Sequence, residues 1–287
     1  MTTRISLQTL ASTASIGALA VSASLPTAAS AQSVMGQGAA SGYKVSAEGG
    51  LAVSDFSNQT FADKGGVYEK DEGFYGAVSV SKAISDTWDW RVSASAMSFG
   101  DNTALIFDGP DPLFSTQTFS AGTVDLDIGR VESAGSTDVR LGFGVIAANI
   151  KQSFTNTLPS FGFDGGVDTS FKGFGLKLSA DVSHPLSRGS ALRLIGGASI
   201  APMSGTFKTT PTGDKLGSGV GDSTNGNLVL TSAYLGLGYD FSDKAGMRFG
   251  VRSDHFEGNT GFSGTSGTID DGSVSTTAAF VGVDIQF

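Results

Sequence analysis

Only a few side chains in this sequence are of the kinds that carry out chemistry. Asp125 and Asp127 form an Asp-x-Asp pair, and Asp254 precedes His255, so carboxylates and an imidazole are available for general acid and base catalysis. The run GSGVG at 217–221 has the glycine density of a phosphate-binding loop. Whether these groups can act together depends on the elements that position them.

Composition narrows the classes of function. The 287 residues include no cysteine and only two histidines, which excludes disulfide scaffolds, cysteine nucleophiles and cysteine-ligated metal centres. The formal net charge of −9, with 18 Lys+Arg against 27 Asp+Glu, argues against a nucleic-acid partner. The acidic residues Asp108, Asp111, Asp270 and Asp271 lack the spacing of a calcium loop, so we expect no metal or cofactor.

The first 31 residues have the features of a cleaved secretory signal. Arg4 is followed by an apolar stretch and then by Ala29-Ser30-Ala31. The apolar stretch is too short to span a bilayer as a helix. We therefore predict a signal peptide over 1–31 for export to the periplasm, a short periplasmic tail over 32–42 and one folded domain over 43–287.

Apolar residues alternate with polar or small residues in ten segments of the remaining chain. This period of two predicts β-strands with one apolar and one polar face. The ten predicted strands cover 43–54, 73–83, 88–98, 119–129, 139–148, 171–183, 191–201, 228–240, 247–256 and 276–287.

The connections between these strands alternate in length. Short turns at 84–87, 130–138, 184–190 and 241–246 alternate with long polar segments at 55–72, 99–118, 149–170, 202–227 and 257–275. This layout is typical of an all-β, antiparallel up-and-down transmembrane β-barrel with short periplasmic turns and five long extracellular loops. In such a barrel Asp125 and Asp127 lie at the periplasmic end, far from Asp254, and His255 shares the apolar face. No hydrolytic site assembles from them, so we do not expect an enzyme.

A soluble barrel with an apolar interior would show the same alternation. Two features favour apolar faces that point toward lipid. These faces are almost free of charge, with Lys82 at a strand end as the exception. Aromatic residues also gather at the predicted periplasmic strand ends, where an interfacial girdle belongs: Tyr43, Trp88, Trp90, Tyr239 and Phe249.

The last predicted strand supports the same location. It is apolar at every second position, with Val281, Val283, Ile285 and the terminal Phe287 in phase. This pattern resembles the C-terminal recognition strand of outer-membrane barrels, which the barrel-assembly machinery reads during insertion. The resemblance implies the cell outer membrane as the location, and outer-membrane lipid and that machinery as partners.

Four glycine-rich segments carry a broader resemblance. They are VDLDIG at 124–129, RLGFG at 140–144, FKGFG at 171–175 and LIGGA at 194–198. Together they resemble strands of the pore-forming family typified by the Legionella major outer membrane protein, which implies a pore-forming barrel without catalytic residues. The Asp-x-Asp and Asp-His pairs are similar to site residues of ten-stranded omptin-type proteases. In those enzymes the residues cluster at the extracellular rim, which the positions expected here do not match.

Charges on the polar faces alternate in sign around the predicted barrel. Read from strand to strand near the periplasmic end, the series is Arg91, Asp127, Arg140, Asp181, Arg193, Asp240, Arg248, Asp284 and, across the seam, Lys44. Opposite charges on facing positions of neighbouring strands attract each other. We therefore predict a ring of ion pairs in the lumen.

Barrel size connects this ring to function. Ten strands enclose a backbone radius of roughly 10 Å, most of which long inward side chains would fill. The sequence predicts a narrow pore for passive diffusion of small polar solutes or ions. The alternative is a closed structural or adhesive barrel whose extracellular loops bind partners.

Overall fold

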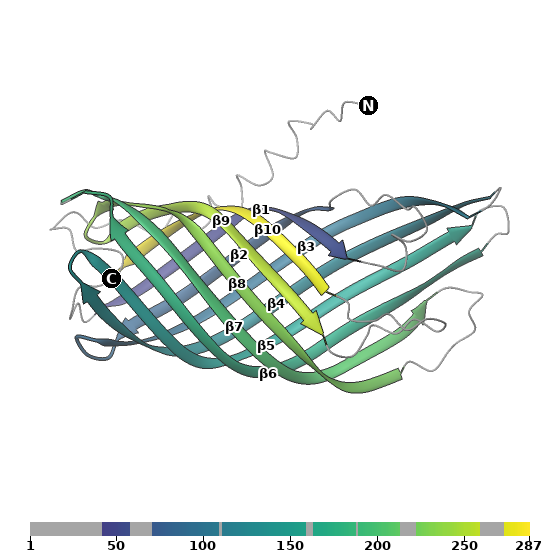
Figure 1. Cartoon of the computed structure of the whole chain (residues 1–287), viewed down its shortest axis with the longest axis horizontal. Helices are drawn as coiled ribbons and strands as arrows, with labels where there is room; N and C mark the ends of the chain where they lie inside the picture. The colour runs from purple at the N-terminus through teal and green to yellow at the C-terminus, as the bar shows by residue number, and fades with distance from the viewer. Residues whose placement is uncertain are drawn as a thin grey trace, which may run out of the picture.

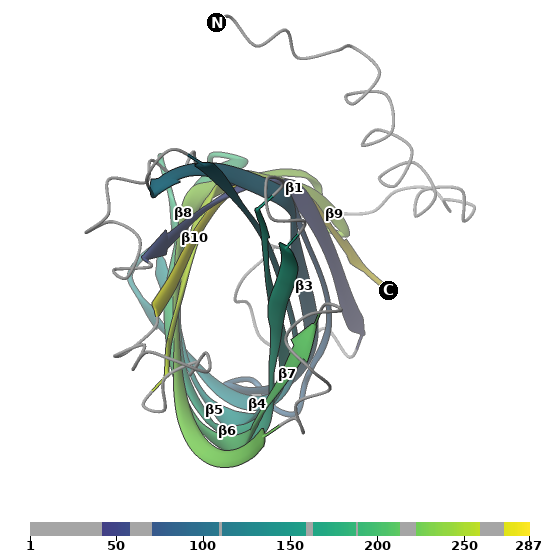
Figure 2. The same cartoon turned by 90° about the vertical axis from the view of Figure 1, so that its right-hand side faces the viewer.

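Ten antiparallel strands close into a single barrel in the computed structural model (Figures 1 and 2). The structure describes residues 42–57, 71–108, 111–158, 163–187, 189–212, 222–258 and 273–287. The predicted signal peptide, residues 32–41 of the tail, the glycine-rich run 217–221, Asp270 and Asp271 lie outside these residues. No helix among the described residues is long and apolar enough to cross a membrane.

The strands confirm the predicted fold class and strand number. Each strand pairs with its neighbours in sequence, and β1 pairs with β10 to complete the barrel. The strands are β1 (Tyr43–Ser57), β2 (Asp71–Ala83), β3 (Trp88–Asp108), β4 (Asp111–Ala134), β5 (Thr137–Leu158), β6 (Phe163–Pro185), β7 (Leu192–Thr212), β8 (Asp222–Ser242), β9 (Ala245–Gly258) and β10 (Ser273–Gln286).

The alternation of side chains decides which face of each strand points outward. Along β5, buried and exposed residues alternate from Arg140 to Gln152. The exposed positions of its first half are Leu141, Phe143 and Val145, each more than half exposed. Large apolar residues are exposed in the same way on the other strands, so the barrel carries an apolar belt on its outer wall. A soluble barrel would bury these residues, whereas a bilayer covers them.

The wall of the barrel differs in height around its circumference. Strands β3 to β8 have 21–24 residues, whereas β1, β2, β9 and β10 have 13–15. At a tilt near 40°, a 22-residue strand rises about 55 Å, roughly twice the height of a membrane-embedded apolar band. The long strands therefore continue well beyond the apolar belt, toward the right of Figure 1.

Three of the five segments expected as long loops are occupied largely by strands. Most of 99–118 and 149–170, and much of 202–227, lies in strands rather than in loops. In these extensions most outward positions are polar, for example Ser120 and Thr118 on β4 and Lys151 on β5, with Phe114 on β4 as an exception. The backbone ladder continues there without an apolar outer face, so the alternation used to predict strands disappears while the strand does not.

The short connections hold the opposite end together. Gly135 begins the two-residue turn between β4 and β5 with a φ of 67°, a conformation that glycine adopts without a steric cost. In the turn between β2 and β3, the Trp88 amide donates to Ser85 Oγ at 3.2 Å. At the seam, which no hairpin joins, the Phe287 amide donates to the Tyr43 carbonyl at 2.9 Å.

Candidate functional site

Charged side chains at the short-turn end of the lumen form a network that crosses non-adjacent strands. Arg91 on β3 lies 3.3 Å from Asp127 on β4 and 3.1 Å from Asp181 on β6. Arg140 on β5 pairs with Asp127, lies 2.7 Å from Asp89 and lies 3.7 Å from Asp181. The side chain of Asp127 is completely buried, so these cations replace the water that a carboxylate would otherwise bind.

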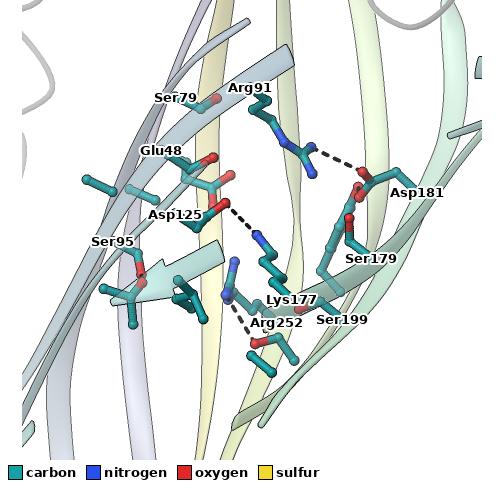
Figure 3. Close-up of a pocket in the computed structure, with 18 of the residues that line it drawn as sticks. Glu48, Ser79, Arg91, Ser95, Asp125, Lys177, Ser179, Asp181, Ser199 and Arg252 are labelled. Atoms are coloured by element: carbon teal, nitrogen blue, oxygen red, sulfur yellow. Dashed lines mark hydrogen bonds and ion pairs between the residues drawn. The ribbon is translucent and has the colours of Figure 1, made fainter. Parts of the chain in front are cut away.

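Two further contacts extend this first cluster across the lumen. Lys177 Nζ donates to Asp125 Oδ1 at 2.7 Å and lies 3.8 Å from Asp127. The Tyr234 hydroxyl donates to Asp181 Oδ1 at 3.1 Å, which brings β8 into contact with β6. Figure 3 shows Arg91 directed toward Asp181, and Lys177 toward Asp125, from opposite sides of the space between them.

A second cluster joins both sides of the β1–β10 seam. Arg248 on β9 lies 3.1 Å from Glu48 and 3.9 Å from Asp284, and Lys44 also lies 3.9 Å from Asp284. The Ser46 hydroxyl of β1 donates to Asp284 of β10. Because its partners come from β1, β9 and β10, this cluster links strands that only backbone pairing would otherwise hold together.

Deeper in the lumen, Tyr75 connects the seam to β9. Its hydroxyl donates to Glu48 and accepts a hydrogen bond from Arg252 Nη1 at 3.1 Å. Arg252 also pairs with Asp254 at 2.8 Å. Nothing in the sequence pattern singles out Tyr75 or Tyr234, because each is one aromatic residue among many. The sequence could have indicated their role only through their positions, which fall on the same face of the strand as the inward polar residues.

The nine residues of the predicted ring all line the lumen. Five neighbouring pairs of the series are in contact, and the contacts fall into two clusters rather than one continuous ring: Arg91 with Asp127, Asp127 with Arg140, Arg140 with Asp181, Arg248 with Asp284, and Asp284 with Lys44. Arg193 pairs with Asp138 at 3.1 Å and donates to Ser183 Oγ at 2.6 Å, instead of pairing with its neighbours in the series. Asp240 lines the same cavity as Lys44 and Arg248. The reason is the narrow lumen: long side chains reach across it, as Arg91 does from β3 to β6, and pass over the strands between.

The other half of the lumen is filled mainly by apolar side chains, which the sequence pattern does not predict, together with buried polar residues such as Gln117 and Gln152. Phe119 of β4 and Phe256 of β9 meet with ring centroids 5.7 Å apart. In the closed order of ten strands, β4 and β9 lie five strands apart in either direction, so they are opposite walls. The contact therefore spans the full width of the barrel.

Further aromatic and aliphatic residues surround this contact. Phe99 lies 6.0 Å from Phe119, and Phe171 lies 4.7 Å from Phe207, as measured between ring centroids. The residues that we call the apolar layer are at most 7% exposed: Met97, Phe99, Phe119, Ile150, Phe171, Met203, Phe207, Leu228, Leu230, Phe256 and Phe280.

A signal for the apolar layer is present in the sequence. Each phenylalanine of the layer has the same odd or even parity as an inward charge on its own strand. Phe119 matches Asp127, and Phe171 matches Asp181. The strand phase set by the charges thus assigns the phenylalanines to the lumen, although their apolar character suggests the opposite face.

Cavities remain within the polar half of the lumen, and two of them are lined by the described residues of the charged clusters. The larger, about 420 Å³, lies between the short turns and the first cluster and is lined by residues such as Asp86, Trp88 and Arg193. The smaller, about 140 Å³, lies deeper, where Lys177 and Arg252 face it. Phe280 and Leu230 of the apolar layer also line the smaller cavity, so the apolar layer bounds the polar space.

The predicted aromatic girdle lies on the outer wall near the short turns. Tyr43, Trp88, Tyr239 and Phe249 are 43–47% exposed, and the Tyr43 ring packs edge-on against Trp90 at 6.2 Å. Phe241, which the prediction left out, is 61% exposed and packs on Tyr239. The C-terminal residues Val281, Val283, Ile285 and Phe287 share the outward face of β10, with Phe287 70% exposed.

The candidate catalytic residues do not form a common site. Asp254 points into the lumen and pairs with Arg252, whereas His255 lies on the outward face with Nδ1 2.8 Å from Ser275 Oγ. Asp125 and Asp127 are held in ion pairs within the first cluster. Among the described residues, no three His, Asp or Glu side chains gather as a metal site would require.

The barrel geometry matches solved structures of known fold. The outer membrane protease OmpT from Escherichia coli aligns with a TM-score of 0.56 at 11% identity, over 88% of this chain and 99% of that one. The fold is that of an outer-membrane β-barrel. A major outer membrane protein from Thermus thermophilus aligns with a TM-score of 0.42 at 14% identity, over 85% of this chain and 99% of that chain.

Neither of the other comparisons supplies a family. No family model matches the chain, and no curated protein matches it. Membership in the pore-forming family typified by the Legionella protein therefore stays a prediction.

Proposed function

We propose that this chain is a structural barrel of the outer membrane whose lumen is closed in the resting state, and whose tall β3–β8 wall is presented outside the bilayer for contact with partners. The contact between Phe119 and Phe256 carries the proposal, because it joins opposite walls of the barrel. An ion would have to displace this buried layer and cross an environment with few polar groups, at a high cost in free energy.

The short turns would lie in the periplasm and the tall wall outside the cell. Three features support this orientation: the outer apolar belt, the aromatic residues near the short turns, and the outward apolar residues at the end of β10. Outer-membrane lipid and the assembly machinery that reads the last strand are the partners that these features imply.

The ion pairs have a structural part in this proposal. Asp125, Asp127, Asp181 and Asp284 are nearly buried, and each meets at least one cation. Such clusters fix the relative position of strands because every member loses its partner if the register slips. They also occupy the space through which solutes would otherwise pass.

Single-channel recording in planar bilayers tests the closed lumen. We expect the purified wild-type barrel to give no discrete current steps, and the Phe119→Ala/Phe256→Ala double variant to give them, because the contact across the barrel is lost. Phe143→Ala is the matched control, since Phe143 is 57% exposed on the outer wall. Discrete steps from the wild-type protein, unchanged in the double variant, would instead establish the narrow pore expected from the sequence.

A further inference from the structure

Three lysines lie together on the outer wall just beyond the apolar belt. Lys151 of β5, Lys172 of β6 and Lys208 of β7 are exposed and point outward. The other lysines among the described residues lie elsewhere: Lys44 and Lys177 face the lumen, and Lys82 and Lys244 lie at the short-turn end. The three outward lysines therefore concentrate positive charge on one part of an acidic protein.

The strand register places these three side chains around one point. Ser170 of β6 pairs with Lys151 on one side and with Lys208 on the other, so the two lysines flank it. Lys172 lies two residues from Ser170 on the same face of β6. Neighbouring and diagonal positions of a sheet are about 5–8 Å apart, so three flexible ammonium groups can converge on one anion of phosphate size.

The surface next to the lysines changes from polar to apolar between two successive outward positions of β6. Phe174, two residues beyond Lys172 on β6, is 75% exposed. Its partners across the strands are Ala147 and Ser204, which are too small to cover the ring. An anionic group at the lysines and a hydrocarbon chain along Phe174 would thus lie side by side on this wall.

Within the described part of the chain, no carboxylate pairs with these lysines. None of the three forms an ion pair with a described residue. The outward carboxylate of Asp168 lies diagonal to Lys151 and Lys208, on the side of Ser170 away from Lys172 and Phe174, so the group keeps a net positive charge when Asp168 is counted. Lysines at the edge of a bilayer extend toward the headgroups while their stems lie along apolar surface. Charge complementarity points to a lipid that carries a negative headgroup.

We propose that Lys151, Lys172 and Lys208 bind the phosphate of a phosphorylated glycolipid in the outer leaflet, with Phe174 packed along its acyl chains. This assignment rests on the orientation given under Proposed function, in which the tall wall lies outside the cell. It does not depend on whether the lumen conducts, so the current recordings and the binding experiment can fail independently.

Binding of bis-phosphorylated lipid A to the folded barrel in a non-ionic detergent tests the site. The test variant is Lys151→Gln/Lys172→Gln/Lys208→Gln. The control variant, Lys82→Gln/Lys244→Gln/Arg130→Gln, removes the same charge near the short turns. Resistance of the unheated barrel to unfolding by SDS on gels establishes that both variants are folded.

We expect the test variant to bind at least tenfold more weakly, the control variant to bind as the wild type does, and Phe174→Ser to bind several-fold more weakly. Dephosphorylated lipid A with the same acyl chains should bind weakly to every protein, and inorganic phosphate alone should not compete at millimolar concentration. Equal affinity of test variant and wild type, equal loss in the control variant, or tight binding of the dephosphorylated lipid would each overturn the proposal. Competition by inorganic phosphate would identify a free-anion site and would also overturn it.

Discussion

Neutralising Arg140 should destabilise the barrel more than neutralising Arg140 together with Asp127. The four carboxylates of the first cluster (Asp89, Asp125, Asp127 and Asp181) and its three cations (Arg91, Arg140 and Lys177) carry a net charge of −1. Arg140→Gln alone makes this charge −2 in a buried space. Adding Asp127→Asn restores it to −1, so the second change relieves the first.

The magnitude follows from burial. Removing one partner of a buried pair costs about 3–5 kcal/mol, and Asp127 keeps Arg91 at 3.3 Å and Lys177 at 3.8 Å, so we expect Arg140→Gln to cost about 3 kcal/mol. Asp127→Asn alone raises the net charge of the cluster from −1 to zero and should cost less than Arg140→Gln. The loss in unfolding free energy of the double variant should be about 1–3 kcal/mol smaller than the sum of the losses of the two single variants.

Urea unfolding of the barrel in detergent micelles measures these values, with the fluorescence of Trp88 and Trp90 and gel mobility as two readouts. The control cycle uses Arg130 and Glu132, an exposed pair on the outer wall whose side chains are more than half exposed. Its coupling should stay below about 1 kcal/mol. If the losses of Arg140→Gln and Asp127→Asn simply add in the double variant, the two residues do not share a buried network and the reasoning is refuted.

Two further predictions concern packing and assembly. A Cβ at Gly175 would lie 1.9 Å from the Pro202 carbonyl oxygen, so Gly175→Ala should lower the free energy of unfolding by about 1–3 kcal/mol. Gly122→Ala is the control and should have a much smaller effect, because the nearest atom to its Cβ would be 3.9 Å away. Equal losses of the two variants in urea unfolding would contradict the close approach at Gly175. Phe287→Ser should slow insertion by the assembly machinery several-fold in a reconstituted assay. Phe241→Ser, at a similarly exposed aromatic residue of the same end, should not slow it. The same insertion rate for both variants would contradict a special role for the last residue.

The sequence predicted the barrel well where each strand separates an apolar from a polar face. On β5, Leu141, Phe143 and Val145 alternate with inward residues, and the strand was identified from that contrast. For the continuation of the same strand from Asn149 to Leu158, the sequence pattern predicts a loop, whereas the structure has a strand. There the outward positions are polar, and what maintains the strand is backbone pairing with β4 and β6, which leaves no trace in hydropathy.

The lumen was harder to predict because two properties of its residues conflict. The phase of Asp127 and Arg140 correctly placed the charges inside, yet the pairing of Arg193 with Asp138 and of Arg91 with Asp181 depends on the reach of side chains across a closed space. Phe119 and Phe256 are apolar residues in a polar phase. Only the closed order of strands shows that they meet.

The seam between β1 and β10 has a consequence for how the barrel opens and closes. Its partners, such as Ser46 and Asp284, are separated by almost the whole chain, so bringing them together costs more loop entropy than forming any hairpin. The seam is also built from two of the shortest strands. Amide protons of β1 and β10 should therefore exchange with solvent sooner than those of β5 and β6. The last step of folding is then the pairing of β1 with β10, which closes the barrel.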